Sequence, residues 1–324
     1  MIEVDKIWNS YPDLKGELTL VLDLMKKNVK CKDKKIENSI IELIESGGKL
    51  LRPAFVLIGS KFGNYDREKS VPTAAVIEML HMASLVHDDV IDDSKLRRGQ
   101  ETIQSKYGKD YAVYIGDYLF CVCFKILATS SSLQAIKMDS RAMSKICMGE
   151  VNQLNSRYST KLSIKEYLSR ISGKTAELFS LSLSLGAAEC DAKKNITKTL
   201  YNIGHNLGMA FQIIDDILDY EGNDESIKKS AGNDLKQGIY TSPFIYASMN
   251  NPKEFKKFIG NDELEDEDIK EIIKKVKENN GVADARQLAG KYMEKCFKGI
   301  DSLPNSEYKE ILNDISKWLL LREY

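Results

Sequence analysis

Two short acidic motifs are the residues of this sequence best suited to chemistry. The spacing DDxxD occurs in HDDVIDD and again in FQIIDDILDY, and it supplies two sets of carboxylates: Asp88, Asp89 and Asp92, and Asp215, Asp216 and Asp219. On a helix, side chains four residues apart project from one face about one turn apart, where like charges repel. One such motif is equally well explained as a charged helix end in solvent. Two motifs indicate bound cations, and carboxylates with phosphate oxygens are the ligands that Mg²⁺ accepts.

Basic residues alternate with the acidic motifs along the chain. They lie in GGKLLRP, directly after the first motif, in GKTA and in a long polar segment: Lys49 and Arg52, Arg97 and Arg98, Lys174, and Lys229. Each of them alone would pass for a solvated surface residue. Together they are what a site needs if it holds a diphosphate both through metal and through direct hydrogen bonds.

The composition excludes several classes of protein. The 47 basic and 48 acidic residues almost balance, which argues against a general nucleic-acid binder. The six cysteines form no CxxC pair, and three histidines leave little material for a zinc site. The N-terminus has no apolar signal core, and no apolar run reaches the length of about 18 residues that predicts a membrane span. We therefore expect a soluble cytoplasmic protein.

The elements that carry these residues are predicted to be helices. Proline is absent between Pro72 and Pro243, and turn signals typical of hairpins are missing there as well. Residues 73–90 and 196–220 are apolar around much of their circumference, as buried helices are, and each segment leads into an acidic motif. Residues 175–189 alternate leucine with serine like a strand, but their leucine and alanine content favours helix. The prediction is a single all-α domain over residues 1–324, with a polar loop at 221–234 that closes as a lid.

In this order, the motifs resemble those of the trans-isoprenyl diphosphate synthases, or polyprenyl synthetases. The resemblance runs from GGKLLRP at 47–53 to DLKQGIYTSP at 234–243. Within the family, EMLHMASLVHDDVIDDSKLRRGQETI is most similar to medium- and long-chain enzymes, including the catalytic component of heptaprenyl diphosphate synthase. The resemblance implies an all-α helical bundle with a central cavity, in which the two acidic motifs lie on facing central helices.

The resemblance also implies a role for each matching residue. Magnesium, three ions in the family's pattern, would grip the allylic diphosphate through Asp88, Asp92 and Asp215, supported by Asp89, Asp216 and Asp219. The cations that bind the same diphosphate would be Arg97, Lys174 and Lys229. The diphosphate of isopentenyl diphosphate would be held by Lys49, Arg52, His81 and Arg98. The residues that face the carbocation would be Thr175 and Gln212.

The implied reaction is a head-to-tail trans condensation of farnesyl or geranyl diphosphate with isopentenyl diphosphate. The growing chain would pass Ser84 and Ala83, four and five residues before Asp88, whose small side chains leave the cavity open. At about one helical turn per isoprene unit, we expect a product of about thirty to thirty-five carbons, suited to quinone side chains. The alternative is a farnesyl or geranylgeranyl diphosphate synthase, with a product of about fifteen to twenty carbons. In that case Ser84 and Ala83 would serve only helix packing.

Two other classes of protein are remote alternatives. A class I terpene cyclase has no need of GGKLLRP, and a non-catalytic synthase subunit would be free to lose acidic residues that this chain keeps. The family implies a homodimer, or a heterodimer with a small non-catalytic subunit, and peripheral membrane contact for product release. The chain departs from the family at Lys228, where glycine is common, and at Ile239, where lysine is common.

Overall fold

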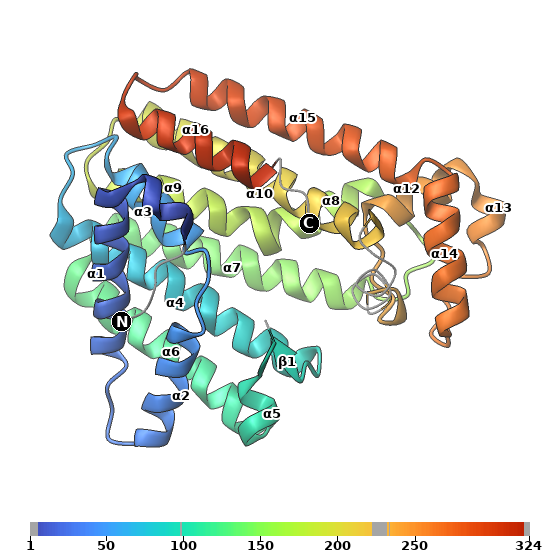
Figure 1. Ribbon diagram of the computed structural model, residues 1–324, viewed down its shortest axis with the longest axis horizontal. Helices are drawn as coiled ribbons and strands as arrows, with labels where there is room; N and C mark the ends of the chain where they lie inside the picture. The colour runs from blue at the N-terminus through green and yellow to red at the C-terminus, as the bar shows by residue number, and fades with distance from the viewer. Residues whose placement is uncertain (1–5, 98, 222–231, 233, 321–324) are drawn as a thin grey trace. The chain divides into compact units, whose positions relative to one another are not determined.

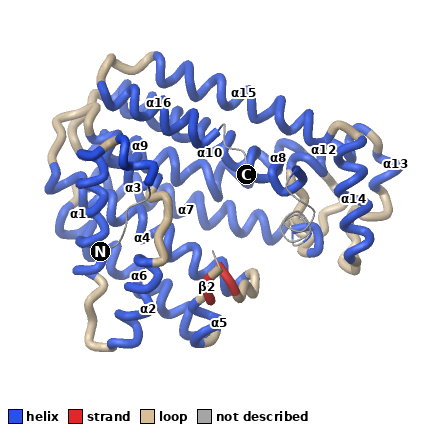
Figure 2. The backbone as a smooth tube through the Cα atoms, viewed as in Figure 1, coloured by secondary structure: helices blue, strands red, loops and turns tan. Residues whose placement is uncertain are grey.

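The computed structural model describes residues 6–97, 99–221, 232 and 234–320. These residues are mainly helical, which confirms the all-α prediction (Figures 1 and 2). Within the described chain, strand occurs only in a short antiparallel hairpin, in which β1 (Leu96–Arg97) pairs with β2 (Gln100–Glu101).

The described chain divides into two compact units. The first takes in the described residues up to Asp139 together with Ser182–Thr197. The second takes in Ser140–Leu181 and the described residues from Lys198 onward. The single domain over residues 1–324 remains a prediction.

The first unit is centred on the helix that carries the first acidic motif. Its elements are the 3-10 helix η1 (Lys6–Ser10), α1 (Pro12–Asn28), α2 (Lys34–Glu45), α3 (Leu51–Ser60), α4 (Arg67–Ile91), the hairpin, α5 (Ile103–Tyr107), α6 (Lys109–Ser130), and parts of α7 (Leu133–Asn155), α9 (Glu177–Glu189) and α10 (Lys194–Glu221). The Asp66 side chain caps the start of α4 by accepting from the Glu68 backbone N–H at 2.9 Å. The helix α4 packs against α1, α3 and α6, and Figure 1 shows α4 and α6 side by side.

The second unit carries the second acidic motif. It holds the remainder of α7, α9 and α10, with α8 (Ile164–Ile171), the π-helical turn η2 (Ser172–Ala176), α12 (Ser242–Asn250), α13 (Pro252–Phe255), α14 (Asp266–Glu278), α15 (Gly281–Asp301) and α16 (Glu307–Leu320). The segment 175–189 is helical as predicted, and its serines are buried along with its leucines, so their alternation does not mark one exposed face. The proposed lid at 221–234 lies largely outside the described residues, as do Lys228 and Lys229.

The helix α6 differs from one expectation. It is long and apolar enough to cross a membrane by length and composition, although the sequence has no unbroken apolar run of that length. The mean hydropathy stays high because single charged residues are spaced among aromatic and aliphatic ones. In the structure 44% of this apolar window is buried, and α6 packs on α4 as a core helix of its unit.

Candidate active site

The first acidic motif lies at the C-terminal end of α4. Asp88 is in the last turn, and Asp92 follows the helix as its C-cap, with its backbone N–H donating to the Asp88 carbonyl oxygen at 2.8 Å. Both residues are half-buried. Negative charge is disfavoured at a helix C-terminus, where the helix dipole presents its own partial negative charge, and α4 has no basic residue in its last turn. This end of α4 is therefore suited to a bound cation.

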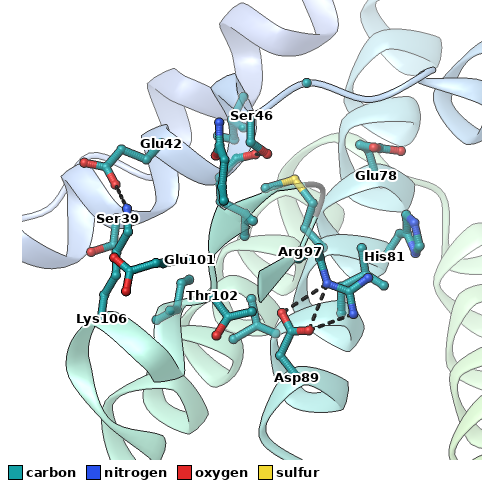
Figure 3. Close-up of a pocket in the computed structure, with 18 of the residues that line it drawn as sticks. Ser39, Glu42, Ser46, Glu78, His81, Asp89, Arg97, Glu101, Thr102 and Lys106 are labelled. Carbon is teal, nitrogen blue, oxygen red and sulfur yellow. Dashed lines mark hydrogen bonds and ion pairs between the residues drawn. The ribbon is translucent and has the colours of Figure 1, made fainter. Parts of the chain in front are cut away.

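The second aspartate of this motif has a different partner. Asp89 is only 6% exposed, and the Arg97 Nε donates to both of its carboxylate oxygens, at 2.9 and 3.1 Å. The Arg97 Nη2 lies 2.8 Å from Asp89 Oδ1, and Figure 3 shows the guanidinium turned toward the carboxylate. The Gln104 Nε2 donates to the backbone oxygens of Asp89 and Ser94, at 2.9 and 2.8 Å. The Arg97 bonds fasten the hairpin to the end of α4, and the Gln104 bonds fasten α5 to the same end.

A cavity of about 90 Å³ lies against this ion pair (Figure 3). Its lining is mostly apolar and includes three of the predicted site residues: His81, Asp89 and Arg97. Lys49 and Arg52 are outside this lining and lie at the start of α3, where Leu50 takes a left-handed backbone conformation with φ of 49°. The Lys49 carbonyl accepts from the buried Trp8 Nε1 at 2.8 Å, which anchors the GGKLLRP segment. Arg98 lies outside the described residues.

The residues predicted to set product length lie on the same helix. Ala83 is fully buried, as is Met79 one turn earlier, and Leu80 is nearly so. The Ser84 hydroxyl donates to the His81 carbonyl oxygen of its own helix at 2.8 Å, so its polar group is satisfied locally. The face of α4 that leads away from Asp88 therefore carries small side chains at its first turn and bulkier ones at the next.

The second acidic motif lies in the last two turns of α10, which also lack a basic residue in the final turn. Asp215 and Asp219 are half-buried, whereas Asp216 is 5% exposed. The Tyr167 hydroxyl and the Gln212 Nε2 donate to the two carboxylate oxygens of Asp216, at 2.6 and 2.9 Å. Burial raises the pKa of Asp216 to about 8, although these two hydrogen bonds act in the opposite direction.

The motif GKTA forms the π-helical turn η2, a local widening of the helix that is frequent at functional sites. The turn presents Thr175, whose Oγ1 donates to Gln212 Oε1 at 2.8 Å. Because Gln212 also donates to Asp216, these side chains form one hydrogen-bonded row from the turn to α10 and on to Tyr167. The two residues that the resemblance placed at the carbocation are thus in contact. The neighbouring Lys174 pairs with Glu150 at 2.9 Å.

The donor chemistry fits magnesium within each unit. Among the described residues no group of three or more His, Cys, Asp or Glu side chains could hold a metal ion by itself. Asp88 with Asp92, and Asp215 with Asp219, each supply hard oxygen donors about one turn apart. That arrangement suits Mg²⁺, which commonly binds through one or two carboxylates and takes its other ligands from water and substrate phosphates.

Three residues of these networks were missed by the sequence reasoning. Tyr167, Glu150 and Gln104 contact Asp216, Lys174 and the backbone of Asp89, respectively. A hydroxyl, an acid and an amide on otherwise ordinary helices carry no signal of their own in a single sequence. The position of Ile239, where the family often has lysine, is nearly buried and apolar in this chain.

Comparison with known proteins places these features in one class, the prenyltransferases. The family model described as polyprenyl synthetase matches residues 33–276. Heptaprenyl diphosphate synthase component 2 of Geobacillus stearothermophilus is 35% identical over 98% of this chain and 100% of its own. The crystal structure of geranylgeranyl pyrophosphate synthase from Lactobacillus brevis superposes with a TM-score of 0.94 at 36% identity, over 98% of this chain and 99% of the other.

A further solved structure is that of polyprenyl synthase from Caulobacter crescentus, complexed with calcium and isoprenyl diphosphate. It has a TM-score of 0.88 and 30% identity, and 95% of each chain is covered. The present chain belongs to the polyprenyl synthetase family, as its motifs predicted. It is a trans-prenyltransferase that makes a polyprenyl diphosphate, and its family depends on divalent metal.

Proposed function

We propose that the chain condenses an allylic diphosphate with isopentenyl diphosphate, head to tail and in trans, to an all-trans product longer than about twenty carbons. The observation that supports this most strongly is the pair of acidic motifs, each placed at the C-terminal end of a long helix. Farnesyl and geranyl diphosphate are the proposed primers. The allylic diphosphate would be held through Asp88, Asp92 and Asp215, with three magnesium ions.

The proposed roles of the remaining residues are to bind the two diphosphates and to stabilise the allylic cation. Magnesium, when bound, neutralises the diphosphate so that it can depart. Arg97, Lys174 and Lys229 donate hydrogen bonds to that diphosphate, and the C–O electron pair leaves with it. Lys49, Arg52, His81 and Arg98 hold isopentenyl diphosphate, whose double bond attacks the allylic cation to form the new C–C bond. The oxygens of Thr175 and Gln212 stabilise that cation, and the departed diphosphate takes the proton that is lost.

The proposed product has about thirty to thirty-five carbons, at about one helical turn per isoprene unit. Support comes from the small side chain of Ala83, five residues before Asp88, although this residue is fully buried and does not line the cavity beside Asp89. Relatives point to different lengths, since one is named a heptaprenyl and another a geranylgeranyl synthase. The test is to incubate the purified chain with farnesyl diphosphate, isopentenyl diphosphate and Mg²⁺ and to size the product. A product that stops at about twenty carbons contradicts the proposed length.

We also propose that two copies of this cytoplasmic chain associate through the outer face of α6, with membrane contact only at the periphery. The exposed residues of that face are unusually apolar, with Tyr114 71% and Phe124 63% exposed. In an antiparallel pairing about Cys121, Asp117 of each copy meets Lys125 of the other, and Tyr114 meets Ala128. Opposite charges and large-to-small pairing thus coincide in one register.

Two measurements test this association. The exposed Cys121 lies on the proposed twofold axis, so mild oxidation should cross-link two copies through it, while Cys121→Ser should abolish the cross-link. Asp117→Lys should disrupt the dimer seen by sedimentation, and adding Lys125→Asp should restore it. A monomer in solution contradicts the pairing. A relative named component 2 implies a second subunit for that protein, and capture of such a subunit by α6 in place of a copy would also contradict it.

A further inference from the structure

The acidic partner of Lys174 belongs to neither acidic motif. The Lys174 Nζ lies 2.9 Å from Glu150 Oε2, and the two residues are 24 positions apart, on η2 and α7 of the same unit. The side chains are 31% and 26% exposed, so the pair is partly shielded from water. An acid this close to a lysine that is meant for a diphosphate requires an explanation, because it would be expected to compete with the substrate.

The backbone around the pair is built for close approach. A Cβ added to Gly149 would lie 2.8 Å from the Lys174 backbone nitrogen and 3.0 Å from the Gly173 carbonyl carbon. A Cβ on Gly173 would lie 3.0 Å from the Lys145 carbonyl oxygen and 3.1 Å from Gly149 Cα. The two glycines therefore let α7 touch the π-helical turn directly. This contact fixes the origin of the Lys174 side chain, and Glu150 fixes its charged end.

A separate polar cluster already holds the two segments together. The Lys145 ammonium donates to both carboxylate oxygens of Glu177, at 3.0 and 3.2 Å, and to the Tyr201 hydroxyl at 3.0 Å. Glu177 is buried, and Tyr201 donates to it at 2.8 Å. The packing of α7 against this region thus has its own ion pair about one turn away, at the start of α9 directly after η2. Glu150 is not needed for it, and a partly exposed pair such as Glu150 with Lys174 contributes little to stability.

We propose that Glu150 is a positioning residue that holds the Lys174 ammonium ready for the allylic diphosphate. This inference rests on the proposed role of Lys174. An ammonium has three N–H donors, so with one of them bonded to Glu150 the other two remain for phosphate oxygens. Without Glu150 the lysine side chain regains its rotamer freedom and must be ordered again when substrate binds. For Glu150 to aid binding, this orienting effect must outweigh the repulsion between its carboxylate and the diphosphate.

The test separates orientation from charge by equilibrium binding of farnesyl diphosphate in Mg²⁺ without isopentenyl diphosphate, measured by calorimetry on the full chain. The Glu150→Ala variant should bind farnesyl diphosphate about tenfold more weakly than the wild type, because the Lys174 side chain loses its ordered rotamer. Glu150→Gln keeps an oxygen acceptor for Lys174 but loses the charge, so its Kd should stay within about twofold of the wild type. The matched control is Glu294→Ala, which removes an exposed ion pair with Lys298 on α15 of the same unit and should change nothing.

Variants of Lys174 separate the positioning role of Glu150 from the proposed role of Lys174 in binding the diphosphate. Lys174→Ala should weaken binding at least as much as Glu150→Ala, and the double variant should be no weaker than Lys174→Ala alone. If Glu150→Ala binds as well as the wild type, or if both Glu150 variants bind more tightly, the positioning role is wrong while that of Lys174 stands. If Lys174→Ala has no effect, both assignments fail. Thermal unfolding of each variant shows that weaker binding does not come from a lost fold.

Discussion

The ion pair between Asp89 and Arg97 predicts that the second aspartate of the first motif stabilises the fold and positions Arg97. The Asp89 carboxylate is 9% exposed and the Arg97 side chain 35%, with three N–O contacts between 2.8 and 3.1 Å. An exposed pair contributes about 0.2–1 kcal/mol, while breaking a buried pair costs about 3–5 kcal/mol. Because only one partner is buried, we expect a coupling of about 2 kcal/mol.

A double-mutant cycle measures this coupling. Urea unfolding of Asp89→Ala, Arg97→Ala and the double variant gives three changes in the free energy of unfolding. We expect the double variant to be about 2 kcal/mol more stable than the sum of the single changes predicts. Changes that add to within about 0.5 kcal/mol would refute the reasoning, because residues that do not interact behave in that way.

Metal dependence separates this role from that of a magnesium ligand. If Asp89 serves Arg97, Asp89→Asn leaves the Mg²⁺ concentration for half-maximal turnover within about twofold of the wild type, whereas Asp88→Asn raises it by at least about tenfold. Equal increases in the two variants would show that Asp89 is a metal ligand. The KM for the allylic substrate should rise in Asp89→Asn, since Arg97 loses its charged anchor.

Three other predictions test the proposed site. Asp88→Ala and Asp215→Ala should each lower turnover by roughly 10³-fold or more with a melting temperature within a few degrees of the wild type, and normal turnover in Asp215→Ala would disprove the two-motif site. Arg52→Ala should raise the KM for isopentenyl diphosphate about tenfold more than the allylic KM, and Lys174→Ala the reverse; equal effects would mean the roles are misassigned. Ala83→Phe should shorten the product to about fifteen to twenty carbons while the first condensation persists, as chromatography of the dephosphorylated products would show.

The helices were predictable because their signals are local. Apolar periodicity foretold α10 and the part of α4 after Pro72, whereas α4 itself begins at Arg67 and contains Pro72. The helix α4 starts before Pro72 because the Asp66 side chain caps it at Arg67. The contact of Thr175 with Gln212 joins two residues that the family resemblance had placed together, and neither spacing nor composition would have found it.

The sequence did not show the direction in which each aspartate points around its helix, nor its hydrogen-bond partners far away along the chain. A motif written DDxxD treats its aspartates alike, but consecutive residues on a helix point about 100° apart. Asp89 and Asp216 therefore turn to the buried side of their helices, while Asp88 and Asp215 remain half-exposed. The partner of Asp216 is Tyr167, 49 residues earlier, and a single sequence gives no sign of such a pair.

The two buried aspartates also explain how acids are tolerated at unfavourable helix ends. The dipole disfavours negative charge at the C-terminal ends of α4 and α10, yet each end carries three aspartates; at α10 the raised pKa of Asp216 removes part of that charge. In each motif the protein satisfies the middle carboxylate internally, with Arg97 for Asp89 and with Tyr167 and Gln212 for Asp216. The flanking carboxylates, about one turn apart, are then left on the more exposed side of the helix, where bound cations would offset their charge. On the proposed function, the DDxxD spacing would join one structural aspartate to flanking ones that face the metal and the diphosphate.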